Sequence, residues 1–62
     1  MEVEVRDREL IVKSGSFLAV YYKAAGQPQL ILRHRTRTDD DELLAKAWKA
    51  VCDKARELGW II

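Results

Sequence analysis

The chain has 62 residues, one cysteine, and 11 basic against 10 acidic side chains. This length predicts a single small domain over residues 1–62 with little core to spare, and the balanced charge excludes a global field that would attract nucleic acid or an anionic membrane. The lone Cys52 excludes an intrachain disulfide. Because neither a secretory signal nor an apolar stretch of about 20 residues occurs, we expect a cytoplasmic protein that does not enter membranes.

The first half of the chain has the composition of β-strands. Residues 9–13, 17–24 and 29–36 are rich in β-branched, aromatic and leucine side chains, which favour strands. Turn residues separate these segments at Ser14-Gly15-Ser16 and at Ala25-Gly26-Gln27-Pro28. We therefore predict a three-stranded antiparallel β-meander.

The register of this meander depends on the loop lengths. Three-residue loops at 14–16 and 25–27 give the sheet one uniformly apolar face. The residues on that predicted core face are Leu10, Val12, Leu18, Val20, Tyr22, Leu30 and Leu32, with His34 at its end. A two-residue loop in the second hairpin would set Leu18 beside Arg33, so we favour the three-residue loops.

The N-terminal residues fit this pattern less simply. Val3 and Val5 alternate at odd positions, whereas Leu10 and Val12 alternate at even ones. The parity therefore breaks near Asp7, where a bulge or a tight turn must intervene. Two interpretations stay open: one long bulged strand, or an additional short strand over residues 2–6.

From Thr38 onward the apolar residues recur at intervals of three and four, which predicts an amphipathic helix. Its apolar stripe comprises Leu43, Leu44, Ala47, Trp48, Val51, Cys52, Ala55 and Leu58. Thr38 is expected to cap the helix, the acids at 39–42 favour its positive end, and Gly59 ends it. The tail over residues 60–62 either folds back on the core or meets a partner. The predicted fold is α+β, with the order β-β-β-α and the helix on one face of the sheet.

The sheet face that this helix leaves uncovered is the predicted interaction surface. Its residues are Ile11, Phe17, Tyr21, Ile31, Arg33, Arg35 and Arg37. An apolar patch on so small a chain is typical of a partner surface, so our first hypothesis is self-association or the docking of another protein.

Nucleic-acid binding through the same face is the alternative hypothesis. Rings on a sheet can stack on bases, and arginines spaced at i, i+2 and i+4 over residues 33–37 would share one side and contact phosphates. The acids at 39–42 oppose this reading, since they neutralise arginines and repel phosphate. A solvated edge strand with ion pairs explains the same arginines.

The sequence offers little catalytic chemistry. His34 and Cys52 are the only imidazole and thiol, and no spacing brings them together with a third group to orient a base. Neither paired metal-ligand spacings nor a phosphate-cradling glycine pattern occurs. We therefore expect a non-enzymatic domain with no cofactor, no metal and no small-molecule substrate.

Overall fold

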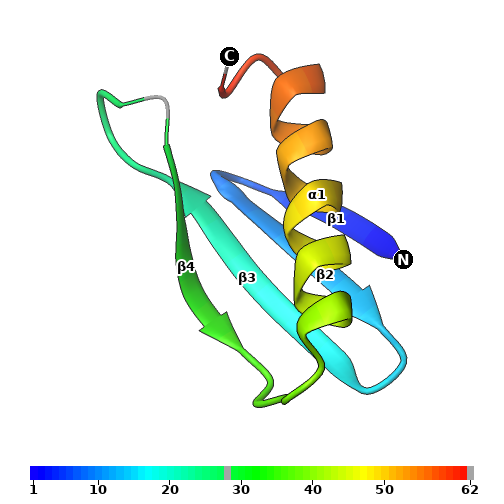
Figure 1. Cartoon of the computed structure of the whole chain (residues 1–62). Coiled ribbons are helices and arrows are strands. Elements are labelled where there is room, and N and C mark those ends of the chain that lie inside the picture. Colours follow the sequence, from blue (N-terminus) through cyan, green and yellow to red (C-terminus); the bar gives the residue numbers. More distant parts are fainter. Residues whose placement is uncertain (28, 62) are drawn as a thin grey trace.

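A computed structural model describes residues 1–27 and 29–61 of the chain. Four antiparallel strands form one sheet in the order β1-β2-β3-β4, and a C-terminal helix lies on one face (Figure 1). The elements are β1 (Glu2–Arg6), β2 (Glu9–Ser14), β3 (Phe17–Lys23), β4 (Leu30–Arg35) and α1 (Asp41–Glu57). The predicted α+β meander with a C-terminal helix is confirmed, and residues 2–6 form a separate strand, so that the order is β-β-β-β-α.

A tight turn at Asp7 explains the break in parity near the N-terminus. Asp7 adopts a φ of 54°, a left-handed conformation that aspartate tolerates better than most residues. The turn pairs Arg6 with Glu9, and Val3 then lies opposite Val12. Odd positions of β1 therefore share a face with even positions of β2.

The register between β2 and β3 differs from the prediction. Gly15 and Ser16 alone form the turn, with Gly15 at a φ of 57°, so that Ser14 pairs with Phe17 and Leu10 with Tyr21. One residue fewer in the loop turns every side chain of β3 to the other face of the sheet. The predicted placement of Leu18, Val20 and Tyr22 in the core is therefore wrong, and the alternate residues Phe17, Ala19 and Tyr21 are buried there instead.

A β-bulge interrupts the pairing of β3 with β4. Tyr21 lies opposite Leu32 and Val20 opposite His34, which leaves Arg33 as the extra residue. His34 consequently shares a face with Val20, on the side away from the helix, and its predicted place at the end of the core face is wrong. Tyr22 pairs with Ile31 rather than with Leu30.

The helix cap lies two residues later than predicted. Asp40 is the N-cap, and its Oδ1 accepts a hydrogen bond from the Leu43 N–H at 3.0 Å. Thr38 Oγ1 accepts from the Asp40 N–H at 3.1 Å, so Thr38 supports the residue that caps. The residues of the buried core are Leu10, Val12, Phe17, Ala19, Tyr21, Ala47, Val51 and Ala55.

Trp48 departs from the predicted apolar stripe, because 47% of its surface is exposed. Its ring packs beside Tyr21 with 5.5 Å between centroids, at the flank of the core. The prediction that Trp48 is a core residue is wrong. The buried residues of the helix are Ala47, Val51 and Ala55, one per turn, together with Cys52 beside Val51.

The residues after α1 turn back toward the sheet. Gly59 adopts a φ of 77°, its N–H donates to Arg56 O at 3.1 Å, and the Trp60 N–H donates to Ala55 O at 2.8 Å. These two bonds form a Schellman motif. Trp60 and Ile61 are half-buried against the core, so this part of the tail folds back, while Ile62 lies outside the described residues.

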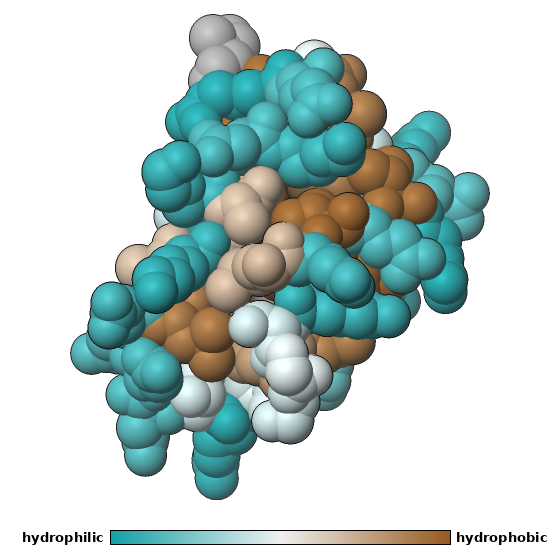
Figure 2. All heavy atoms as spheres, turned by 90° about the vertical axis from the view of Figure 1, so that its right-hand side faces the viewer, coloured by the Kyte–Doolittle hydropathy of each residue, from teal (hydrophilic) through white to brown (hydrophobic). Residues whose placement is uncertain are grey.

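Figure 2 shows the side of the molecule that carries β1, where hydrophilic residues surround apolar ones. The helix in the described part of the chain is too short and too polar to cross a membrane.

Candidate interaction surface

Strand β4 is an edge strand that neither layer of the fold covers well. Its four central residues are exposed, and only Leu30 and Arg35 at its ends are half-buried. The reason is the position of α1, which packs closest to β2 and β1 and leaves β4 apart (Figure 1). Ile31 is 37% exposed on one face and Leu32 is 44% exposed on the other. Apolar side chains of one strand therefore reach solvent on both sides of the sheet.

We call the sheet surface away from α1 the open face. Cross-strand pairing assigns to it the apolar residues Ile11, Leu18, Val20, Tyr22 and Ile31. Ile11 is only 9% exposed although it lies outside the core cluster beneath α1, so its neighbours on the open face shield it. The open face thus has an apolar centre that is already partly dehydrated.

Charged residues at the margin of the open face pair with one another. Arg33 Nη1 lies 2.8 Å from Glu9 Oε2 across the sheet. Glu4 meets Lys13 at 3.8 Å and Arg6 at 3.4 Å. These exposed pairs add little stability, but they cancel much of the local charge. A partner that covers the apolar centre would therefore not meet a strong electrostatic field of one sign from these charged residues.

A groove of about 340 Å³ runs between β4 and α1 on the other side of the sheet, lined by Gln29, Leu30, Trp48 and Ile61. Leu32 lies on the same side of the sheet, because it pairs with Tyr21 of the core. The exposed face of Trp48 belongs to this groove. Apolar residues of the helix, the tail and β4 therefore come together there without closing over one another.

The structure redistributes the apolar residues of the predicted interaction surface. Ile31 lies on the open face as expected, and Ile11 lies there too but is nearly buried. The placement of Phe17 and Tyr21 on that surface is wrong, since both are buried beneath α1. The physical reason is the two-residue turn, which places the large rings of β3 against the helix.

The three arginines do not share one side, contrary to the prediction. Arg33 is held over the open face by Glu9, whereas Arg35 pairs with Ala19 and therefore lies on the helix side. The bulge at Arg33 breaks the alternation on which the prediction depended. Arg37 follows β4 in the connection to α1.

Sequence reasoning missed several residues of the surface. They are Leu18, Val20 and Tyr22 on the open face, Leu32 on the helix side of the sheet, and Trp48 at the groove. A two-residue turn at Gly15-Ser16 would have identified the first three. Nothing in the pattern of the helix indicates that it lies over β1 and β2 and leaves β4 uncovered.

His34 and Cys52 lie on opposite sides of the sheet. His34 is exposed on the open face, whereas Cys52 belongs to α1 and is buried. Burial raises the pKa of the Cys52 thiol, with partial opposition from Arg56. These two side chains cannot act as a catalytic pair, and the described residues contain no cluster of three metal-ligating side chains.

The buried thiol and phenol predict a loss of stability at alkaline pH. Burial raises the pKa of Tyr21 above its ordinary value of 10.0, and that of Cys52 above 9.0. The folded state thus holds both protons more tightly than the unfolded state does, so this stability is present below the ordinary pKa and is lost as pH rises through the raised one. We expect the urea midpoint of unfolding to fall above about pH 9. In the variant with both Tyr21→Phe and Cys52→Ala, the urea midpoint should fall less steeply with pH than in the wild type. If the two midpoints fell in parallel, these two groups would not be the source of the loss.

Comparison with protein-family models, with curated proteins and with solved structures gives no match for this chain.

Proposed function

We propose that the chain is a non-enzymatic, cytoplasmic interaction module that forms a homodimer through β4. The observation that carries the proposal is the exposure of apolar side chains on both faces of this one edge strand, Ile31 on the open face and Leu32 on the helix side. An edge strand also presents unpaired N–H and C=O groups along its free side. A strand added there would satisfy these groups and cover both apolar sides together.

A second copy of the chain suits this edge for three reasons. Two β4 strands related by a two-fold axis would place the apolar residues of each beside those of the other. The net charge of +1 and the internally paired margin of the open face leave little repulsion between copies. A 62-residue chain with a small core and a free cysteine in place of a disulfide gains stability by burying more surface.

The proposal predicts that Ile31→Lys combined with Leu32→Lys converts the dimer to a monomer. Replacing an exposed leucine or isoleucine at the centre of an interface by a charged residue is expected to weaken the dimer about tenfold. Light scattering and sedimentation equilibrium over a range of protein concentrations measure the change. Because the contact is apolar, the wild-type dimer is expected to persist at high salt.

Val5→Lys is the matched control. Val5 is 41% exposed and lies in β1, the edge strand at the opposite side of the sheet. The control variant should remain a dimer. A wild-type protein that is monomeric at every concentration would refute the proposal, and dissociation by Val5→Lys alone would move the interface to β1. If the protein assembled only after a different protein was added, β4 would bind that protein rather than a second copy of the chain.

Nucleic-acid binding through the arginine strand is the second candidate, with less support. Glu9 neutralises Arg33, and the bulge separates Arg33 from Arg35. This candidate requires affinity that falls with each arginine removed and weakens steeply with salt. Light scattering at two salt concentrations with a mixed oligonucleotide pool separates it from dimerisation, since a dimer would ignore the oligonucleotides.

A further inference from the structure

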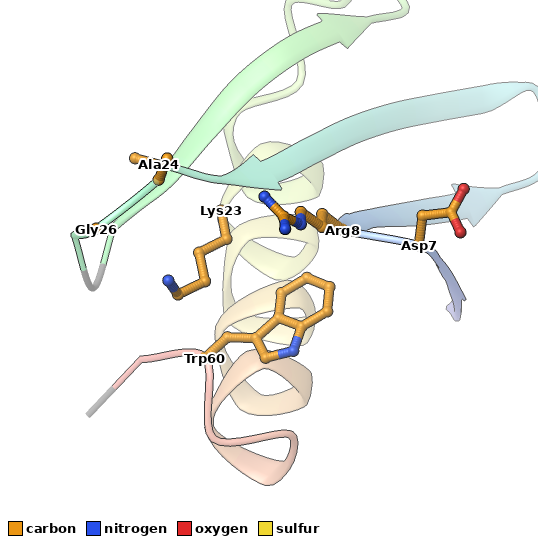
Figure 3. A pocket seen from close by; sticks show the side chains of 7 residues that line it. Asp7, Arg8, Lys23, Ala24, Gly26 and Trp60 are labelled. Atoms are coloured by element: carbon orange, nitrogen blue, oxygen red, sulfur yellow. The ribbon is translucent and has the colours of Figure 1, made fainter.

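Three distant segments meet in a pocket at one end of the sheet (Figure 3). It has a volume of about 450 Å³ and is lined by Asp7, Arg8, Lys23, Ala24, Ala25, Gly26 and Trp60. The segments are the β1–β2 turn, the end of β3 with the turn that follows it, and the tail after α1. None of the lining residues belongs to β4.

Backbone hydrogen bonds hold each wall of this pocket. The Lys23 N–H donates to Arg8 O at 3.3 Å, which ties the end of β3 to the β1–β2 turn. The Gln27 N–H donates to Ala24 O at 3.2 Å and closes the adjoining turn. The Schellman motif fixes Trp60 opposite both. Main-chain hydrogen bonds therefore fix the backbone of all three segments that form the pocket.

Two cations and one carboxylate line the pocket, so its net charge is positive. Within residues 1–27 and 29–61, neither Arg8 nor Lys23 forms an ion pair, whereas Arg33 and Lys49 each have a carboxylate oxygen at 2.8 Å. Asp7 lines the rim, but its side chain is directed away from the two cations in Figure 3. Two cations are thus available for an anion.

Trp60 supplies a flat apolar surface beside these cations. Its indole is half-buried, with one part packed against the core and the rest bordering the pocket (Figure 3). No cation–π pair joins it to Arg8 or Lys23 in the described part of the chain. An aromatic surface that its own neighbours leave open can stack on a planar ring.

We infer that this pocket binds a nucleoside phosphate, with the base against the indole of Trp60 and the phosphate between Arg8 and Lys23. Cations alone would accept any anion, and an indole alone would accept any flat apolar ring. Together, the cations and the indole select a ligand that carries both a negative charge and a planar ring. A free nucleotide and a nucleotide within single-stranded nucleic acid share this chemistry. The inference goes beyond the proposed dimerisation and concerns different residues.

The chain has two tryptophans, so Trp48→Phe makes Trp60 the only one. This background leaves the pocket intact, because Trp48 does not line it. Titration with adenosine 5′-monophosphate is expected to change the fluorescence of Trp60 saturably. Inorganic phosphate and adenosine, which each lack one half of the ligand, should bind more weakly. Arg8→Gln and Lys23→Gln should each weaken binding by about fivefold, since an exposed charge pair contributes modestly.

Lys46→Gln is the matched control, because Lys46 is exposed on α1 and pairs with Glu42. It should leave binding unchanged. Trp60→Leu should abolish stacking while circular dichroism shows the fold retained, and binding of this variant is followed by calorimetry. A single-stranded oligoadenylate that binds tighter than the mononucleotide identifies nucleic acid as the source, and equal affinity identifies a free nucleotide.

The inference is overturned if the mononucleotide gives no saturable change, if Arg8→Gln and Lys23→Gln bind as well as the background protein, or if Trp60→Leu keeps full affinity. Light scattering of the same samples reports the oligomeric state independently. Arg8→Gln should stay dimeric while its affinity for the nucleotide falls about fivefold. A failure of the pocket is therefore distinguishable from a failure of the β4 interface.

Discussion

Phe17→Ala is expected to unfold a large fraction of the protein, whereas Leu18→Ala leaves it folded. Phe17 is 4% exposed and belongs to the core beneath α1, and truncating a buried phenylalanine costs about 3–5 kcal/mol. A domain of this size has only about 0.05–0.15 kcal/mol of stability per residue. Leu18 is half-buried on the open face, so its truncation should cost about 1 kcal/mol.

Urea unfolding followed by circular dichroism, at one fixed protein concentration, measures both variants. Tyr21→Ala and Tyr22→Ala form a second pair, with Tyr21 buried and Tyr22 half-buried. The buried member of each pair should have the lower midpoint. If Leu18→Ala and Tyr22→Ala were the more damaging variants, β3 would have the register of a three-residue loop and the structural assignment of its faces would fail.

This contrast shows why the register was the least predictable part of the fold. Strand β3 reads Phe-Leu-Ala-Val-Tyr-Tyr-Lys and is apolar at both odd and even positions. Alternation therefore cannot decide which face is buried. Ser14-Gly15-Ser16 supports a turn of two or of three residues equally well. The helix, by contrast, has a clear period and a cluster of acids at its start, and the predicted α+β order with one C-terminal helix was confirmed.

The candidate surface depended on tertiary features that leave little trace in the sequence. The bulge at Arg33 divides a run of arginines that local spacing places on one side. The apolar stripe of the helix predicts burial but does not specify which strands it covers, so the exposure of Trp48 and Leu32 was not foreseeable. The pocket at Trp60 joins three segments that only the fold brings together.

Val51→Asp is expected to unfold the protein at neutral pH. Val51 is fully buried at the middle of the stripe through which α1 packs on the sheet, between Ala47 and Ala55. The core around it consists of apolar residues, and no charged residue among those described is buried. An uncompensated carboxylate there costs roughly 3–5 kcal/mol, comparable to the whole stability of a small domain.

Acidification should partly restore the fold of this variant. Burial would raise the pKa of the new carboxyl above its ordinary value of about 3.9, so the folded state is favoured below that value and is lost as pH rises. Ala45→Asp places the same charge on the exposed side of α1 and should change stability little at any pH. Circular dichroism between pH 3 and pH 7 compares the two. Equal behaviour of both variants would mean that α1 does not bury the Ala47–Val51–Ala55 stripe, and β4 would then no longer be the strand that the helix leaves uncovered.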